Sequence, residues 1–343
     1  MATMADTPLE LKVNTLEGGV ITVQVTQTNT VQELKTMLCE KKHEDPVERK
    51  ILKAEVLLDG ALVHCDSQTL QAVGLLDGEF EVTVVYSRNE VEAATKAEIH
   101  GEGFVQVNLP VSLVEISSKA FENCRQVVKV AIPESVTSIA DHAFAGCSSL
   151  ESVSIPESVA VIGPCAFAEC RSLASITIPG SVRAIGPAAF ARCSSLVSVT
   201  IPESVTAIET CAFEGCKSLV RITIPESLMA IGDNAFAECS SLGSVTIPGS
   251  VTAIGKYAFA GCNMKNIIIP QSVAAIEAWA FEGCESLASV TIPESVTAIG
   301  DHAFAGCKSL ASVTIPESVT AIEQGAFAKC YSLQSVIIPQ SVA

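Results

Sequence analysis

Proline recurs with a fixed period over the last two thirds of this 343-residue chain. From Pro110 to Pro248 the spacing is 23 residues, one step of 22 leads to Pro270, and the spacing of 23 then returns up to Pro339. A fixed period of about 20–50 residues indicates a solenoid, in which each repeat forms one turn that stacks on its neighbours. The sequence therefore predicts a row of stacked turns that share a continuous core.

Phenylalanine and cysteine repeat in step with the prolines, and each cysteine lies three residues after a phenylalanine. The phenylalanines are Phe121, Phe144, Phe167, Phe190, Phe213, Phe236, Phe259, Phe281, Phe304 and Phe327. The cysteines are Cys124, Cys147, Cys170, Cys193, Cys216, Cys239, Cys262, Cys284, Cys307 and Cys330. A thiol that recurs beside a phenylalanine in every turn is expected to pack in the core, so neither disulfides nor metal binding is predicted.

A single repeat shows the local structure to expect. Val153 and Ile155 alternate with polar residues, which predicts a short β-strand with these two side chains buried. Pro156 ends the strand because it has no N–H to donate. The hydroxyl of Ser158 is expected to satisfy turn amides, and a short helical turn is expected to carry Phe167 inward.

The consensus of the repeat reads S-L-x-S-V-T-I-P-E-S-V-T-A-I-G-x-x-A-F-x-x-C. This pattern resembles the BspA-like subfamily of leucine-rich repeats, and the resemblance covers residues 104–343. It implies a curved solenoid with a parallel sheet on its concave side and a role in protein interaction. Members of that subfamily are often surface or adhesion proteins.

Residues 9–88 have a different pattern. Hydrophobic residues alternate over 9–13 and again over 21–25, with a turn between them, which predicts a hairpin. Thr30 and Glu33 form a capping box that opens a predicted helix. Short strands follow, and a last strand contains Phe80, Val82 and Val84.

This order of elements is similar to the ubiquitin-like β-grasp fold. The predicted class is therefore α/β, with a ubiquitin-like domain at 9–88, a junction at 89–103 and the solenoid at 104–343. Conjugation by that family needs a free C-terminal Gly-Gly, whereas here Arg88-Asn89 and more chain follow, so we expect an embedded, non-conjugated module. The family's recognition patch would map to Ile51, or to Leu52 in a shifted register, and to Thr83.

Charge and hydropathy limit the partners. Lys and Arg number 21 against 38 Asp and Glu, a net charge of −17, which argues against nucleic acid and anionic membranes. No apolar run approaches the roughly 20 residues that span a bilayer. The first residues lack the basic and apolar regions of a signal peptide, so a cytoplasmic protein is expected.

Catalytic motifs are missing from the sequence. The five histidines form no HExxH motif, and no phosphate-binding glycine motif follows a predicted strand. Catalysis needs a nucleophile, a base and an orienting group in one place, and the serines of the repeat lie in stacked turns away from the histidines. We expect no enzyme activity, no cofactor and no catalytic or metal-binding residues.

Function in a solenoid is expected where the repeats differ, and the position before Ala-Phe varies most. Its residues are Lys119, His142, Cys165, Ala188, Cys211, Asn234, Tyr257, Trp279, His302 and Gly325. Because the inward positions hardly vary, this row should point outward, with Tyr257, Trp279 and His302 about 5 Å apart. Clustered exposed aromatic residues are typical of interfaces. The hypothesis is a protein-binding site; neutral variation of exposed positions is the alternative.

The sequence thus predicts a non-catalytic adaptor that binds a protein partner of unknown identity. The alternative is an exported, adhesin-like surface protein, and an enzyme ranks third. The last turn, ending at Ala343, has no polar cap, and caps keep solenoids soluble. Either a truncated chain or end-to-end self-association through this turn is therefore expected.

Overall fold

The computed structural model describes residues 9–14, 20–25, 54–58, 61–62, 82–86, 105–109, 113–125 and 127–342. The chain forms two compact units, residues 1–113 and residues 114–343. The predicted helix that begins at Thr30 and the predicted junction at 89–103 lie outside the described residues, and the predicted domain boundaries stay predictions.

The first unit contains a five-stranded sheet. Its strands are β1 (Leu9–Asn14), β2 (Val20–Val25), β3 (Ala54–Leu58), β4 (Ala61–Leu62) and β5 (Val82–Tyr86). The spatial order is β2-β1-β5-β3-β4. β1 pairs antiparallel with β2 and parallel with β5, while β3 pairs antiparallel with both β4 and β5. The predicted hairpin strands are confirmed in β1 and β2, and the predicted last strand is confirmed from Val82 onward in β5, while Phe80 lies outside the described residues. Strand β6 (Val105–Asn108) follows in the chain.

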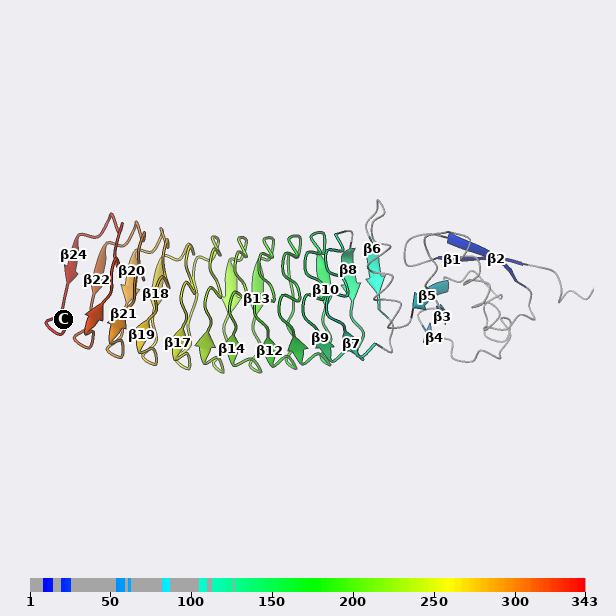
Figure 1. Ribbon diagram of the computed structural model, residues 1–343, viewed down its shortest axis with the longest axis horizontal. Helices are drawn as coiled ribbons and strands as arrows, with labels where there is room; N and C mark the ends of the chain where they lie inside the picture. The colour runs from blue at the N-terminus through cyan, green and yellow to red at the C-terminus, as the bar shows by residue number, and fades with distance from the viewer. Residues whose placement is uncertain are drawn as a thin grey trace, which may run out of the picture. The chain divides into compact units, whose positions relative to one another are not determined.

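The second unit is a solenoid with two ladders of short parallel strands, and Figure 1 shows its coils stacked along one axis. The first ladder comprises β8 (Val127–Ala131), β10 (Ser152–Ser154), β13 (Ser198–Thr200), β15 (Arg221–Thr223), β18 (Asn266–Ile268), β20 (Ser289–Thr291), β22 (Ser312–Thr314) and β24 (Ser335–Ile337). The second ladder comprises β7 (Glu115–Ile116), β9 (Ser138–Ile139), β11 (Val161–Ile162), β12 (Ala184–Ile185), β14 (Ala207–Ile208), β16 (Ala230–Ile231), β17 (Ala253–Ile254), β19 (Ala275–Ile276), β21 (Ala298–Ile299) and β23 (Ala321–Ile322). Only the first ladder was predicted from the sequence.

Neighbouring strands pair at equivalent repeat positions, so Val199 lies beside Ile222 and Val290 beside Val313. In the three-residue strands of β10, β13, β15, β18, β20 and β22 the middle residue is buried and the outer two are exposed. This alternation confirms the predicted strand. The exposed positions carry mainly serine and threonine, so the outer surface of the first ladder consists largely of small hydroxyl groups.

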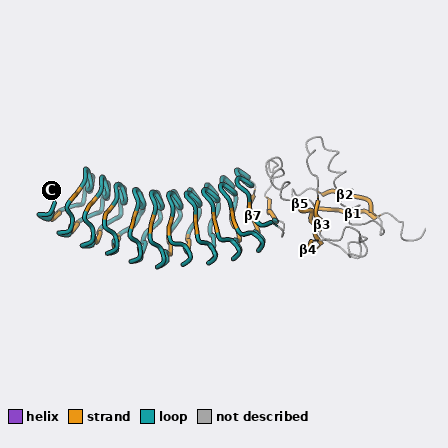
Figure 2. Tube along the Cα trace, turned by 60° about the horizontal axis from the view of Figure 1, so that its bottom comes forward, coloured by secondary structure: helices purple, strands orange, loops and turns teal. Residues whose placement is uncertain are grey.

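The connection that contains each phenylalanine is not the predicted helical turn. Residues 113–125 and 127–342 contain no helix, and Figure 2 shows their coils as strand and loop alone. Cys165 and Glu169 have φ of 53° and 60°, which is the left-handed region and cannot belong to a right-handed helix. The amides of Ala166 and Ala168 bond carbonyls three residues back, whereas the amide of Phe167 donates to the next coil. Alternate amides therefore join the coils to one another.

The core is a column of parallel rings. Successive phenylalanines from Phe121 to Phe327 stack with ring centroids 5.0–5.7 Å apart. The nine phenylalanine residues from Phe121 to Phe304 are at most 1% exposed to solvent. Each turn alone would leave its ring in water, so the stacking of turns is what buries the core. The predicted inward direction of the phenylalanines is confirmed.

The cysteine and serine side chains join neighbouring coils at backbone carbonyls. The thiol of Cys216 donates to the carbonyl of Phe190 at 3.2 Å, and equivalent bonds recur from coil to coil. Burial raises the pKa of Cys216 to about 12, as expected for a core thiol. The hydroxyl of Ser158 donates to the carbonyl of Val136 at 2.6 Å. It therefore satisfies a carbonyl of the preceding coil and not the predicted turn amides.

The 22-residue repeat contains a deletion beside Cys262. Met264 follows Cys262 by two residues and is fully buried, whereas in eight other coils a leucine follows the cysteine by three residues, as Leu242 does. Within the described residues no strand pairing joins β15 to β18 or β17 to β19, and the ladders are also divided between β10 and β13 and between β12 and β14, where the repeat keeps 23 residues. Amides of the turns still cross the deletion, because Tyr257 donates to Ala278 at 3.2 Å.

Candidate protein-binding surface

The variable position before Ala-Phe is left-handed in all ten coils. The values of φ run from 52° to 64° at Lys119, His142, Cys165, Ala188, Cys211, Asn234, Tyr257, Trp279, His302 and Gly325. None of these residues is buried, whereas the alanine that follows each of them is buried in every coil. The row therefore lies at the surface, with Lys119 exposed and the other nine residues half-buried, and its backbone conformation is the same whatever the side chain.

Three consecutive members of the row form one aromatic stack. Tyr257 and Trp279 lie 5.5 Å apart between ring centroids with an interplanar angle of 10°. Trp279 and His302 lie 4.1 Å apart at 3°. Stacked aromatic pairs stabilise by about 0.5–1.5 kcal/mol beyond burial. We call Tyr257, Trp279 and His302 the aromatic stack; it crosses the deletion beside Cys262.

Two residues that were not chosen as site residues from the sequence determine the position of His302: Asp301 contacts the imidazole, and Gly325 leaves space for it. Nδ1 of His302 lies 2.7 Å from a carboxylate oxygen of Asp301. Gly325 follows in the row, and a Cβ at this glycine would lie 2.7 Å from Nε2 of His302. The stack therefore ends where a glycine leaves space for the imidazole. The replacement of a side chain by glycine in a variable row was the sequence feature that could have indicated this.

Two polar atoms of the stack are not used in hydrogen bonds within the described part of the chain. The hydroxyl of Tyr257 and the indole N–H of Trp279 make no hydrogen bond to the described part of the chain, and neither atom is buried. The interior ring faces are already covered by neighbouring rings. The accessible part of the stack therefore consists of ring edges that carry hydrogen-bonding groups.

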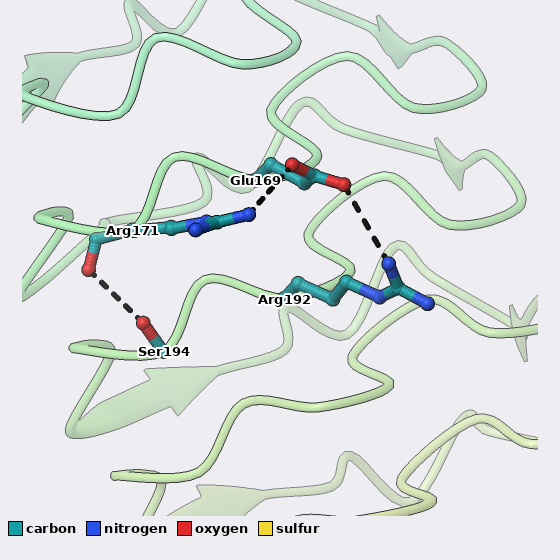
Figure 3. A network of polar contacts seen from close by, with 4 residues as sticks. All are labelled: Glu169, Arg171, Arg192 and Ser194. Atoms are coloured by element: carbon teal, nitrogen blue, oxygen red, sulfur yellow. Dashed lines mark hydrogen bonds and ion pairs between the residues drawn. The ribbon is translucent and has the colours of Figure 1, made fainter.

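A second group of polar side chains lies on the middle coils (Figure 3). The carboxylate of Glu169 accepts a hydrogen bond from Arg171 at 3.1 Å and lies 3.6 Å from the guanidinium of Arg192. The hydroxyl of Ser194 donates to the carbonyl of Arg171 at 3.4 Å. Both arginine side chains are more than 60% exposed, so these ion pairs contribute little to stability.

The predicted ubiquitin-like patch is described only in part. Thr83 lies in β5, opposite Leu57 of β3 and Asn14 of β1. Ile51 and its alternative Leu52 lie outside the described residues. The patch stays a prediction.

The described residues offer no grouped metal ligands. In this part of the chain no three His, Cys, Asp or Glu side chains lie close enough together to hold a metal ion. No helix among the same residues has the length and apolar character needed to cross a bilayer.

The solenoid has known relatives. The family described as the BspA type leucine rich repeat region matches over residues 101–196, 161–288 and 229–343. No curated protein matches the chain. Among solved structures, a leucine-rich repeat protein from Bacteroides ovatus ATCC 8483 is 27% identical, over 86% of this chain and 90% of that one, with a TM-score of 0.48.

A leucine rich cell surface protein from Faecalibacterium prausnitzii A2-165 is 30% identical, over 69% of this chain and 82% of that one, with a TM-score of 0.47. A leucine-rich repeat protein from Eubacterium ventriosum ATCC 27560 is 21% identical, over 76% and 87% of the two chains, with a TM-score of 0.48. The family match covers more than half of the chain and carries the repeat read from its sequence. The chain therefore belongs to the family of BspA-type leucine-rich-repeat proteins.

Proposed function

We propose that this protein is a non-catalytic scaffold that binds a protein partner through the aromatic stack. The observation that carries the proposal is the row of three half-buried, stacked rings whose polar atoms at Tyr257 and Trp279 have no hydrogen-bond partner in the described part of the chain. Tryptophan and tyrosine are enriched among the residues that contribute most to binding energy at interfaces. No other aromatic residues of the described coils stack on a row at the surface.

The stack is ordered before a partner arrives. Each ring is held by its neighbour, His302 is held by Asp301, and the backbone of the row is fixed by hydrogen bonds between coils. A rigid surface loses little conformational entropy on binding, which favours affinity. The outer surface of the first ladder, with its serines and threonines, offers no comparable anchor.

The test is capture of partners by the full chain. Wild type is compared with the triple variant Tyr257→Ala, Trp279→Ala and His302→Ala, and circular dichroism checks that the variant is folded. Alanine is compatible with the row, because Ala188 occupies it with φ of 54°. We expect the specific partner to be lost.

A matched triple variant controls for changes to the row itself. Lys119→Ala, His142→Ala and Asn234→Ala alter three left-handed positions outside the stack and should keep the partner. Retention of the same proteins by both triple variants would assign the aromatic stack to neutral variation and reject the proposal.

The adaptor role adds the first unit as a ubiquitin-like module. The sheet order β2-β1-β5-β3-β4, with a parallel central pair and antiparallel outer pairs, supports this. If the module binds a second partner through the predicted patch, a full chain with Ile51→Ala and Thr83→Ala should lose that partner and keep the one bound by the aromatic stack. If the variant keeps both partners, the predicted patch is not a binding site.

A cytoplasmic location is part of the proposal, and an adhesin-like surface protein is the alternative. Labelling of intact cells with a membrane-impermeant amine reagent separates them. A cytoplasmic protein becomes labelled only after lysis, whereas labelling before lysis supports the surface role.

Self-association through the last coil is the remaining part of the proposal. Tyr331, Ile337 and Ile338 are 76%, 74% and 61% exposed, and such an apolar surface favours association. Light scattering of the full chain should show a mass above that of the monomer at high concentration. A monomer throughout, or a dimer unaffected by Ile337→Lys, would count against it.

A further inference from the structure

We infer that the segment bound by the aromatic stack is basic, an arginine- or lysine-rich stretch of the partner protein. The inference rests on the proposed function, because it assumes that the stack is the binding site. It adds the chemistry of the occupant, which follows from the charges that surround the rings.

Two glutamates flank Trp279 along the chain. The amide of Ala280 donates to the carbonyl of Glu277 at 3.3 Å, and the amide of Glu282 donates to the carbonyl of Trp279 at 3.0 Å. Glu277 and Glu282 thus lie on either side of Trp279 in two consecutive tight turns. Neither carboxylate has an ion-pair partner in the described part of the chain, and Glu277 is exposed.

The stretch that surrounds the stack has a net negative charge. Residues 256–329, which include the whole stack, contain Glu277, Glu282, Glu285, Glu294, Asp301, Glu317 and Glu323, against Lys256, Lys265, Lys308 and Lys329. Lys308 is already paired with Glu285 at 2.6 Å. The middle coils differ, because residues 169–221 contain four acidic and five basic residues. The aromatic stack therefore lies in a stretch with seven acidic and four basic residues, a net charge of −3.

This combination favours long basic side chains. The methylene groups of arginine or lysine can cover the exposed ring edges while the charged group reaches a carboxylate beside them. The indole N–H of Trp279 and the hydroxyl of Tyr257 can then bond to carbonyls of the bound peptide. Complementary charge speeds association and rejects acidic partners.

The chain contains its own control for the carboxylates. Glu209 and Glu214 flank Cys211 in the same positions as Glu277 and Glu282 flank Trp279, within the shared pattern E-x-x-A-F-E-G-C. That coil has the same two acidic residues, but a cysteine in place of an aromatic residue at the row position. Replacing Glu209 and Glu214 by glutamine therefore removes the same amount of negative charge from the molecule without changing a residue of the stack.

Trp279 is the only tryptophan of the chain, so its fluorescence reports on the stack directly. The full chain is titrated with a peptide of about nine residues in which arginine and glycine alternate, and with lysine and glutamate versions of the same length. We expect the fluorescence of Trp279 to change in a saturable way with the arginine and lysine peptides, and to stay unchanged with the glutamate peptide. Raising the salt from about 50 mM to about 500 mM should weaken binding several-fold by screening.

The two carboxylate pairs give the decisive comparison. Glu277→Gln with Glu282→Gln should weaken binding of the arginine peptide about ten-fold, whereas Glu209→Gln with Glu214→Gln should change it less than about two-fold. Equal effects of the two pairs, or equal binding of the glutamate peptide, would overturn the inference. If the Tyr257, Trp279 and His302 triple variant loses its partner but no basic peptide binds, the inference fails and the proposed function stands. If the triple variant keeps its partner, the proposed function itself fails.

Discussion

Trp279 and His302 lie face to face in adjacent coils, with ring centroids 4.1 Å apart and planes 3° apart. Each ring comes from a left-handed residue at the same repeat position, so the solenoid spacing brings the rings together without any contact between distant parts of the chain. Asp301 holds one edge of the imidazole, and Gly325 leaves space for it in the following coil. The stack is therefore a product of the repeat and of one exchange to glycine.

Gly325→Ala should destabilise the protein and disturb the stack. A Cβ here would lie 2.7 Å from Nε2 of His302, and φ is 64°. We expect a loss of about 1–3 kcal/mol, as for other strained backbone positions, and a shifted emission of Trp279 because His302 must move. Urea unfolding and the fluorescence spectrum measure the two effects.

Gly249→Ala is the matched control for that change. A Cβ at Gly249 meets nothing within 4 Å, and its φ is not in the left-handed region. Its effect on stability should be neutral or stabilising by up to about 1 kcal/mol, with unchanged emission. Equal destabilisation by both substitutions would show that the space beside His302 is not what requires Gly325.

A second left-handed position, directly before each cysteine, offers a stabilising change. Glu238 adopts φ of 59°, while glycine occupies the position in other coils, as at Gly261. Glu238→Gly removes the steric cost of a non-glycine residue in the left-handed region, but glycine gives the unfolded chain more conformational entropy. The expected net result is a gain in folding stability of about 0.5–1 kcal/mol. Denaturant unfolding measures it.

The reverse change should cost a similar amount. At Gly261 a Cβ would come no closer than 3.6 Å to its neighbour, so Gly261→Ala isolates the backbone conformation from any clash. A loss of about 1 kcal/mol is expected. If Glu238→Gly destabilises, the left-handed geometry is not what limits stability at this position.

The sequence predicted the inward side chains and missed the backbone that carries them. Val153 and Phe167 were assigned to the core because one residue type in every turn requires one environment, and the structure confirms this. The second ladder was missed because strands such as β12, Ala184–Ile185, are too short to show alternation. The prediction of a helical turn at each phenylalanine was wrong, because residues such as cysteine, tyrosine and tryptophan rarely adopt the left-handed conformation and so gave no sign of it in the sequence.

The candidate surface was predicted in position but not in geometry. Counting along the repeat was enough to place Tyr257, Trp279 and His302 in neighbouring coils. Their face-to-face orientation depends on side-chain rotamers, and the roles of Asp301 and Gly325 depend on distances within about 3 Å, which no repeat period contains. Whether a partner binds there stays a prediction.

Phe213→Ala should be among the most destabilising substitutions in the core. The ring is fully buried and stacks on Phe190 and Phe236 at 5.4 and 5.6 Å. Loss of the ring removes apolar burial and leaves a cavity, for an expected cost of about 3–5 kcal/mol. Val220→Ala, at a valine that is 47% exposed, should stay within about 0.5 kcal/mol. Chemical denaturation compares them, and similar costs would contradict the ring column as the core.

Stability should fall as pH rises above 9, because the buried thiols resist ionisation. Burial raises the pKa of Cys216 and Cys284 from 9.0 to about 12, and that of Cys124 to about 11. In this window the folded state keeps protons that the unfolded state has lost, so the stability is complete below pH 9 and declines as pH approaches 12. Each such thiol contributes about 1.4 kcal/mol of loss per pH unit within the window.

The measurement is the urea midpoint from pH 7 to about pH 10.5. It should be level up to about pH 9 and then fall. Tyrosine and lysine also titrate near pH 10, so the variant Cys216→Ala separates the thiol from them: its stability should decline less steeply, by the contribution of one proton. The same slope in the variant and the wild type would mean that Cys216 ionises as readily when folded as when unfolded, and the buried thiol column would not account for the alkaline loss of stability.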